Sequence, residues 1–434
     1  MKELRIIAKD ALGMITSAGA QKGVAVAVTA ETHEFNVDGG KFSLFRTLFD
    51  NSLRLTAYKD DKKGTVVINS FEDDAVKKAV ADTIASAESG APDPAWDIAP
   101  KTENRTFTSG VIVPDLDKFF FRTKELLETI NKEYPKIIME QMIVTHKTAK
   151  SVYLNSNGAE YEENEGYYSV SLMYSAHDGD KCTSFFGSDV TTTSLDKPFI
   201  EYASMRKDLA DVESQLDTIN VQGKFTGTLL VQPGCMGDVI GTALSNFASD
   251  MPILDGTSIW REKLGEKVAS DCLTVSMAPH NENIVCGENI TADGFIAEDY
   301  DVIKDGKLNR FMLSLYVANK TGLDRAPNSS GAMVVKAGET PLDEIIAGIE
   351  HGIILGRFSG GQPSSNGDFS GVAKNSFLIE NGKIKGALSE TMISGNLADV
   401  LMNVKAISKE TVADGSCVFP YIAFDGVVVS GAEK

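Results

Sequence analysis

The first 91 residues alternate between helical and strand-like patterns of apolar positions. Apolar side chains recur at helical spacing over about residues 3–15 and again over about residues 72–87. Strand-like segments lie between them, at residues 24–30, 42–50, 53–58 and 65–70. Ser70 and Asp73 are spaced like a capping box at the start of the second helix. The pattern predicts a compact α+β domain over residues 1–91.

A proline-rich stretch, SGAPDPAWDIAP, follows this domain. Proline removes amide donors and fixes the backbone, so the stretch is typical of a linker or domain edge. Beyond it, a helix is predicted over about residues 115–132, and four strand-like segments between residues 137 and 193 indicate an antiparallel meander. A helix near residues 200–216 closes the unit. We therefore expect a middle domain over residues 105–220.

From about residue 224 onward, apolar runs become short and glycine becomes frequent. Many short strands joined by tight turns are predicted, with two helices at about residues 340–352 and 395–407. In the first helix, Thr340 is the expected cap, Pro341 lies in the first turn and Gly352 marks the C-terminal end. His351 would then interact with the helix dipole. The whole pattern predicts an α+β protein with a β-rich C-terminal domain over residues 224–434.

Residues 226–250, TGTLLVQPGCMGDVIGTALSNFASD, have the strand–turn–helix pattern on which enzymes often seat ligands and catalysts. An apolar run is followed by a Pro-Gly break and then by residues that can form a helix. The segment contains no His, Glu, Lys or Arg. Its candidates for chemistry are Cys235, Ser245 and two aspartates. The sequence thus predicts a platform that is nearly free of reactive side chains.

Composition and charge exclude several classes of protein. The apolar fraction of 42% and the charged fraction of 24% are typical of a folded globular chain. The 61 acidic and 42 basic residues give a net charge of −19, which works against binding to nucleic acid. Because the carboxylates are scattered, an acidic mimic of DNA is also disfavoured. No window approaches the roughly 18 apolar residues of a membrane span, and the N-terminus lacks a secretory core. We expect a cytoplasmic protein without nucleic-acid or membrane partners.

The side chains that usually carry chemistry are sparse. Five cysteines without a C-x-x-C pair indicate cytosolic thiols, and the five histidines are too far apart to form a helical metal pair. His280 is expected in a loop, with a metal or catalytic role as the alternative. His177 is expected in a turn, with a cation site as the alternative. EYEENEG is expected to be a solvated loop. Ser370 is not in a nucleophile elbow, and SGGQPSSNGDFSG lacks the P-loop lysine. Cys417 is either an inert thiol or a nucleophile.

Five motifs stand in a fixed order in the last part of the chain: LLVQPG, ILDGTSIWREKLGEKVASD, GETPLDEIIAGIEHGIIL, SGGQPSSNGDFSGVAKNSFLIENGK and ISGNLADVLMNV. Together they cover most of residues 226–407 and resemble the TldD/PmbA family. The chain is more similar to the PmbA branch, also called TldE, than to TldD. The N-terminal half agrees with the family only in its order of elements. The resemblance implies a three-part architecture and a soluble bacterial or archaeal protein.

The resemblance also implies a function. TldD and TldE are a pair that forms a heterodimeric metalloprotease acting on unfolded or extended peptides, and an old label calls them modulators of DNA gyrase. TldD holds zinc through an H-E-x-x-x-H motif and a distant cysteine. Here the best placement of that motif puts Ile240 and Ser245 at the histidine positions and Gly241 at the glutamate position. Cys417 lies near the family's metal cysteine without matching it. Zinc needs three protein ligands, so the resemblance implies no catalytic residue, metal ligand or cofactor in this chain.

We therefore expect a metal-free PmbA/TldE-like subunit that partners a TldD-type zinc metalloprotease, in a homo- or heterodimer that acts on extended or unfolded peptides. Extended peptides are often held by strand addition, and the glycine-rich residues 359–367 suit close backbone approach. Gly360, Gly361 and Asn366 are predicted to line such a groove, with tight turns between strands as the alternative. Two other functions remain open. The chain could itself be a metallopeptidase with a cryptic site, or it could modulate gyrase or its inhibitors without proteolysis.

Overall fold

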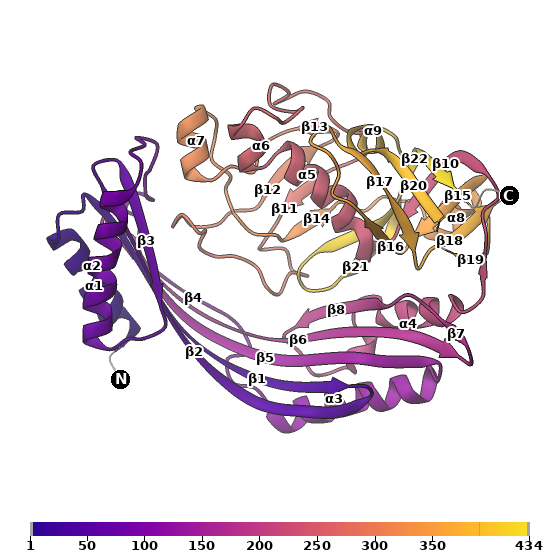
Figure 1. Cartoon of the computed structure of the whole chain (residues 1–434), viewed down its shortest axis with the longest axis horizontal. Helices are drawn as coiled ribbons and strands as arrows, with labels where there is room; N and C mark the ends of the chain where they lie inside the picture. Colours follow the sequence, from indigo (N-terminus) through magenta and orange to yellow (C-terminus); the bar gives the residue numbers. More distant parts are fainter. Residues whose placement is uncertain (1–2, 390, 432–434) are drawn as a thin grey trace.

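The computed structural model describes residues 3–389 and 391–431 (Figure 1). A long curved sheet from the first half of the chain runs beneath a compact β-rich domain from the second half. This arrangement confirms the predicted α+β class. The predicted outer limits at residues 1 and 434 lie outside the described residues.

The first sheet has the strand order β3-β2-β1-β5-β6-β4, and β7 and β8 also pair with β6. Its strands are β1 (Lys22–Asp38), β2 (Lys41–Lys59), β3 (Lys62–Ile68), β4 (Arg105–Gly110), β5 (Ile137–Asn155), β6 (Glu160–Asp178), β7 (Lys181–Cys182) and β8 (Phe186–Thr192). Four of these strands are 17 to 19 residues long. This exceeds the usual five or six residues, and it lets one strand contribute to two packing regions.

The two regions that the sequence predicts as separate domains share this sheet. Residues 24–38 of β1 pair with residues 155–141 of β5 in antiparallel register. The predicted separation at residues 91–105 is therefore corrected, because alternation of apolar positions identifies strands but not their partners. The two segments expected at residues 42–50 and 53–58 are one strand, β2. EYEENEG is not a loop, since it forms the start of β6.

Two pairs of helices cover the first sheet. Helices α1 (Leu4–Ser17) and α2 (Asp73–Ser89) pack with Ala25, Ala27, Leu53 and Leu55 in one apolar cluster. Helices α3 (Leu116–Glu133) and α4 (Met205–Ser214) contribute to a second cluster with strands β5 and β6. The predicted capping box is wrong: Glu72 precedes α2, and the Ser70 hydroxyl accepts a hydrogen bond from the Glu72 amide.

The second sheet has fourteen strands among the described residues, in the main order β13-β12-β11-β14-β22-β10-β15-β18-β19-β9. Its strands are β9 (Thr218–Ile219), β10 (Lys224–Val231), β11 (Val275–Met277), β12 (Tyr300–Lys304), β13 (Lys307–Leu308), β14 (Met333–Val335), β15 (His351–Leu355), β16 (Arg357–Gly360), β17 (Asp368–Lys374), β18 (Phe377–Glu380), β19 (Lys383–Leu388), β20 (Thr391–Asn396), β21 (Val404–Ala413) and β22 (Val418–Ser430). Strand β22 pairs with β10, β14, β20 and β21. It is therefore the centre of the domain.

The helices of the second half are short: α5 (Thr242–Phe247), α6 (Asp250–Leu254), α7 (Leu315–Thr321), α8 (Leu342–Ala347) and α9 (Leu397–Met402). The helix predicted at residues 340–352 ends at Ala347, and His351 starts β15, where it pairs with Glu380. The predicted dipole interaction of His351 is therefore wrong. Cross-strand pairing outweighs the local helical pattern here.

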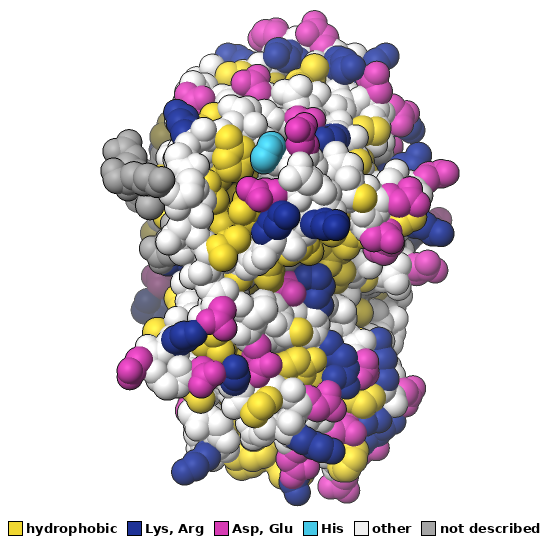
Figure 2. Space-filling model, turned by 90° about the vertical axis from the view of Figure 1, so that its right-hand side faces the viewer, with side chains coloured by type: hydrophobic (Ala, Val, Ile, Leu, Met, Phe, Trp, Pro, Cys, Tyr) yellow, Lys and Arg dark blue, Asp and Glu magenta, His cyan; other side chains and the backbone are white. Residues whose placement is uncertain are grey.

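The surface mixes charges. On the face shown in Figure 2, Lys and Arg side chains are interspersed with Asp and Glu, and apolar side chains are exposed mainly in the middle part. Within residues 3–389 and 391–431, each helix is too short or too polar to cross a bilayer.

Candidate functional site

The predicted platform folds as a strand, a turn and a helix in the middle of the second sheet. Strand β10 lies between β22 and β15 and ends at Val231. A 3₁₀ turn, η2 (Pro233–Cys235), follows the end of the strand. A π-helical turn, η3 (Gly237–Gly241), then leads directly into α5. π-helical turns are rare and often mark functional segments. The strand–turn–helix prediction for residues 226–250 is confirmed.

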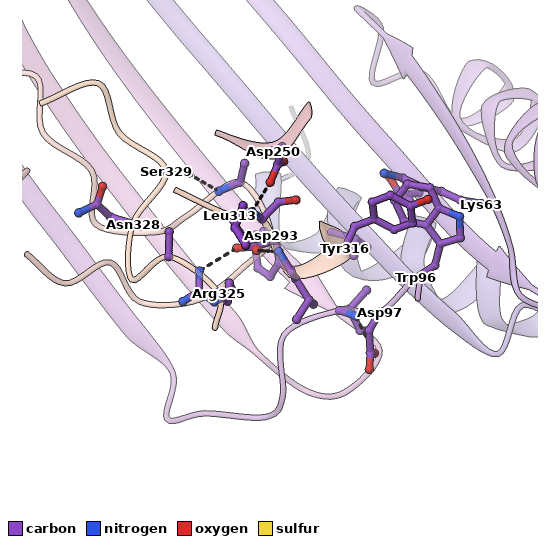
Figure 3. Close-up of a pocket in the computed structure, with 18 of the residues that line it drawn as sticks. Lys63, Trp96, Asp97, Asp250, Asp293, Leu313, Tyr316, Arg325, Asn328 and Ser329 are labelled. Atoms are coloured by element: carbon purple, nitrogen blue, oxygen red, sulfur yellow. Dashed lines mark hydrogen bonds and ion pairs between the residues drawn. The ribbon is translucent and has the colours of Figure 1, made fainter. Parts of the chain in front are cut away.

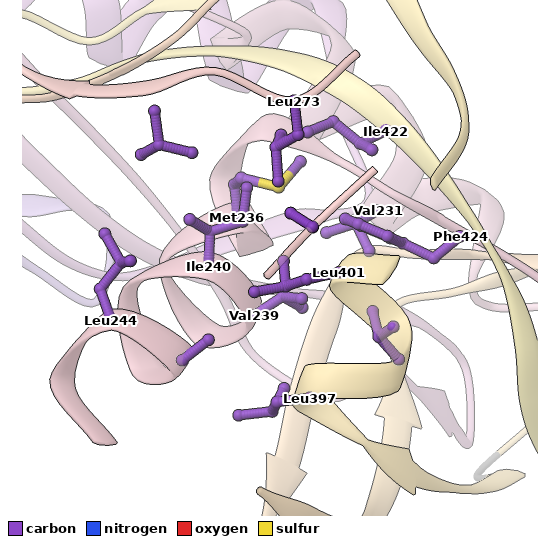
Figure 4. Packing of buried hydrophobic residues seen from close by; sticks show 14 of the residues in the cluster. Val231, Met236, Val239, Ile240, Leu244, Leu273, Leu397, Leu401, Ile422 and Phe424 are labelled. Atoms are coloured by element: carbon purple, nitrogen blue, oxygen red, sulfur yellow. The ribbon is translucent and has the colours of Figure 1, made fainter. Parts of the chain in front are cut away.

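Apolar packing, rather than polar chemistry, dominates the inner side of this platform (Figure 4). Side chains from β10, η3 and α5 meet side chains from α9, β22 and the loop before β11. The labelled members of this cluster are Val231, Met236, Val239, Ile240, Leu244, Leu273, Leu397, Leu401, Ile422 and Phe424. Ile240 is 0% exposed. Complete burial of such a side chain contributes about 1.5–3 kcal/mol to folding.

The three positions that the resemblance assigns to a metal motif do not converge. Ile240 points into the apolar cluster, Gly241 is half-buried and Ser245 is exposed. The Met333 methyl group lies 3.7 Å from where a side chain at Gly241 would begin. Position 240 therefore faces the core, whereas position 245 faces the surface.

A small polar group stands at the N-terminal end of the platform helix. The Cys235 thiol donates to Asp238 Oδ2 at 3.5 Å, and burial raises the pKa of this thiol well above its ordinary value. Partial burial also raises the pKa of the Asp238 carboxyl. The Arg357 guanidinium lies 4.5 Å from the centre of the Phe185 ring. Cys235 is thus a protonated core thiol rather than a nucleophile.

A cavity of about 180 Å³ lies between this polar group and the β8–α4 region of the first half. Its wall contains Asp189, Asp208, Asp238 and Asp414, with Arg357 as the one guanidinium among the residues that line it. Asp208 accepts hydrogen bonds from the hydroxyls of Ser188 and Ser204, at 3.0 and 2.9 Å. Burial raises its pKa to about 6. Its carboxyl therefore takes up a proton in mildly acidic solution.

Cys417 packs against the apolar cluster that contains Met333 and the platform residues. The Cys417 thiol donates to the Gly331 carbonyl at 3.6 Å, and the Met333 methyl group approaches Gly241. Burial raises the pKa of the Cys417 thiol. A protonated, half-buried thiol fits the inert alternative better than the nucleophilic one.

The glycine-rich segment contacts the platform helix. The Asn246 amide of α5 donates to the Ser364 carbonyl at 3.2 Å. Gly360 lies opposite Gly371 in the β16–β17 pair, and a Cβ on Gly360 would stand 2.8 Å from the Gly371 Cα. Gly361 is exposed and has open space around it.

Asn366 serves a turn in this segment. Its side chain bonds to Ser364 and, at 2.9 Å, to Asp368. The tight-turn alternative accounts for these contacts, and the peptide groove at Gly360, Gly361 and Asn366 stays a prediction.

The other candidates lie apart from the platform. His177 lies in β6 opposite Cys182, and not in the predicted turn; its Nε2 lies 3.1 Å from the Ser175 hydroxyl. His280 faces Asp299 at 3.3 Å. The acidic tract of β6 contacts the second half of the chain, where the Asn289 amide donates to Glu163 at 2.7 Å. In the part of the chain that the structure describes, no three His, Cys, Asp or Glu side chains cluster so as to hold a metal ion.

Zinc does not fit the platform. Its ligands are thiolate, imidazole or carboxylate groups held in a tetrahedron. The segment instead presents an aliphatic side chain, a hydrogen and a hydroxyl at the positions in question, with the aliphatic side chain in the core.

Comparison with known proteins identifies the second half. Residues 224–431 match the PmbA/TldA metallopeptidase C-terminal domain, which begins at β10 and includes the platform. Residues 224–431 thus carry a domain of the PmbA/TldD family, and PmbA homologues match most of the chain.

Two curated relatives illustrate the range of this family. Metalloprotease PmbA of Escherichia coli O157:H7 is 23% identical over 425 residues, which cover 91% of this chain and 88% of that protein. A metalloprotease of Methanothermobacter thermautotrophicus is 28% identical over 291 residues, which cover 60% of each chain. The resemblance to PmbA thus extends over nearly the whole chain.

Two solved structures of this family share the fold. TldE from Thermococcus kodakarensis superposes with a TM-score of 0.85 at 17% identity, over 98% of this chain and all of that one. A Bacteroides thetaiotaomicron protein named as a modulator of DNA gyrase superposes with a TM-score of 0.86 at 24% identity, over the full length of both. At these identities the likeness concerns the fold.

Proposed function

We propose that this PmbA/TldD-family chain is a metal-free, PmbA/TldE-like subunit that partners a TldD-type zinc metalloprotease in degrading or processing unfolded peptides. The observation that carries the proposal is the side chain of Ile240. It stands where the resemblance expects a zinc-binding histidine, and it is buried in the apolar cluster of the platform. The chemistry would then reside in the partner, and this chain would supply walls for the site.

The fold is suited to a non-catalytic subunit that forms a wall of the site. A peptidase site that lies between two subunits needs a wall that excludes water and orders an extended substrate. The platform packs firmly and places the glycine-rich segment beside α5 through the contact of Asn246 with Ser364. The names of the relatives support the link to metalloproteolysis, because PmbA is called a metalloprotease and the Thermococcus protein is called TldE.

The test is a peptidase assay with unfolded casein as substrate. Three samples are compared: the full chain alone, a TldD-type subunit from the same organism alone, and the two together after co-purification. We expect cleavage in the mixture, loss of that cleavage with a zinc chelator, and less than one tenth of a zinc ion per copy of this chain when it is purified alone.

Two outcomes would overturn the proposal in favour of the alternatives. If the chain alone cleaves casein and carries stoichiometric zinc, it is itself a metallopeptidase. If it neither binds the TldD-type subunit nor changes its activity, but alters DNA supercoiling by gyrase, it is a non-proteolytic modulator, as the name of the Bacteroides protein suggests.

A further inference from the structure

A larger cavity lies at the other end of the molecule, where the β1–β3 part of the first sheet faces the second half of the chain. Its volume is about 580 Å³ (Figure 3). One wall is the sheet, and the opposite wall is formed by the loops around α6 and α7. Of the platform, residues 226–250, only Asp250 at its C-terminal end lines this cavity.

The sheet wall of this cavity is polar because the strands alternate. Tyr58 lies opposite Lys63, and Thr56 lies opposite Thr65, with the two threonine hydroxyls 3.1 Å apart. Their neighbours along the strands point to the other face, where Leu55 packs with α1 and α2. The polar face is thus left for the cavity, which is the arrangement expected of a sheet with one apolar side.

Two cations on this wall have no carboxylate partner among the residues that the structure describes. Arg54 lies on β2 and Lys63 on β3, and both line the cavity. Lys63 Nζ stands 4.4 Å from the centre of the Trp96 ring. Partial burial and the charge of Arg54 both lower the pKa of Lys63, so the two cations repel each other. An anion between them would remove this repulsion.

The aspartates of the cavity do not play that part, because each of them contacts other partners. Asp97 pairs with Lys22 at 2.6 Å. Asp293 accepts from the Arg325 guanidinium at 3.3 Å and from the Leu315 amide at 3.0 Å. Asp250 accepts from the Ser314 amide at 2.9 Å. Asp250 and Asp293 hold the opposite wall together, Asp97 ties its segment to β1, and none of the three pairs with Arg54 or Lys63.

Aromatic side chains border the two cations. Trp96 stacks on Tyr316, with ring centres 3.8 Å apart and planes inclined by 22°. The Tyr316 hydroxyl donates to Asp93 at 2.8 Å, and this bond holds Tyr316 beside the proline-rich stretch that contains Trp96. A rigid aromatic edge beside a pair of cations favours a ligand that carries one anionic group on a compact organic chain.

We propose that this cavity binds a carboxylate group of a peptide between Arg54 and Lys63. One carboxylate offsets part of the charge of the two cations, whereas a polyphosphate would be repelled by Asp97, Asp250 and Asp293, which also line the cavity, and by the net charge of −19. The carboxylate can belong to a peptide C-terminus or to an acidic side chain. The anion site rests on the cavity alone, and the choice of a peptide as its carrier rests on the proposed function.

Isothermal titration calorimetry of the full chain tests this site without a partner subunit or hydrolysis. The probes are tri-alanine as the free acid, tri-alanine with a C-terminal amide, an amidated tripeptide with a central aspartate, and inorganic phosphate. We expect the free acid to bind and the tri-alanine amide to bind at least about tenfold more weakly, because a charge-assisted hydrogen bond is worth about 1.5–3 kcal/mol. Binding of the aspartate peptide would show that side-chain carboxylates are also accepted.

Variants assign the binding to the two cations. Arg54→Gln and Lys63→Gln should each weaken binding of the free acid about tenfold or more. Lys63→Arg, which keeps the positive charge, should retain most of the binding. Lys150→Gln is the matched control, since Lys150 is an exposed lysine of β5 outside the cavity. The proposal is overturned if neither carboxylate peptide binds, if phosphate binds more tightly than both, or if Arg54→Gln and Lys63→Gln leave binding unchanged. These results do not depend on casein cleavage, so each proposal can fail without the other.

Discussion

Replacing Ile240 by histidine tests whether the position expected for a zinc ligand is part of the apolar core. The side chain of Ile240 is 0% exposed and belongs to the large cluster of the second half. Removing a buried aliphatic side chain costs about 2–5 kcal/mol, and an unsatisfied buried polar group costs about 1–3 kcal/mol more. We therefore expect Ile240→His to lower the free energy of unfolding by at least about 3 kcal/mol. Ser245→His changes an exposed position and should stay within about 0.5 kcal/mol.

Urea denaturation followed by the fluorescence of Trp260 measures this difference in the free energy of unfolding, with a reporter in the same cluster as Ile240. Trp260 is 1% exposed, belongs to the same cluster as Ile240 and lies 5.0 Å from Phe247, ring centre to ring centre. The chain has two tryptophans, so a Trp96→Phe background leaves Trp260 as the only reporter. The midpoint of unfolding should fall in Ile240→His, and the slope against urea should stay unchanged.

The double variant Ile240→His with Ser245→His tests the geometry. Because position 240 is buried in the apolar cluster and position 245 is exposed, zinc should not raise its unfolding midpoint, although any ion bound to the folded state would do so. The reasoning is refuted if Ile240→His is as stable as Ser245→His, or if zinc stabilises the double variant.

Three further outcomes follow from the packing. A Cβ on Gly64 would stand 2.2 Å from the Ala87 amide nitrogen in α2, so Gly64→Ala should destabilise by about 1–3 kcal/mol, whereas Gly13→Ala, in open space on α1, should be neutral or stabilising in thermal unfolding. The pKa of Asp208 is raised to about 6, so the folded state binds its proton more tightly than the unfolded state and loses stability as pH rises from about 4 to 6. Asp208→Asn should remove this loss, which amounts to about 3 kcal/mol at most, in denaturation curves recorded across that range. Iodoacetamide should label exposed Cys182 in the native protein and buried Cys235 only after unfolding, as read by peptide mass spectrometry.

Sequence reasoning worked best where structure is decided locally. The helix expected at residues 115–132 is α3, Leu116–Glu133, and its cap Asp115 accepts from the Lys118 amide. The platform was visible because an apolar run, a Pro-Gly break and a helical pattern follow each other directly. Local patterns were also wrong in places. The helical repeat of apolar residues around Ile345 predicted a helix longer than α8, so the start of β15 at His351 was not predicted.

The larger cavity could not be found in the same way. Its cations lie on β2 and β3, whereas Tyr316 comes from α7, more than 200 residues later in the chain. Lys63 and Arg54 have the appearance of ordinary surface residues in the sequence. Their lack of a carboxylate partner among the described residues emerges only when the facing wall is in place.

The sequence by itself determined the α+β class, the short apolar strands of the second half and the absence of histidine and glutamate at residues 237–247. These properties depend on residue type and on spacings of a few residues, which local physical chemistry fixes. Tertiary structure alone decided that β1 pairs with β5, that Ile240 is buried and Ser245 exposed, and that Arg54 and Lys63 face a cavity. Each of these depends on contacts between residues far apart in the chain, and no local pattern records which distant partner closes a sheet or a cavity wall.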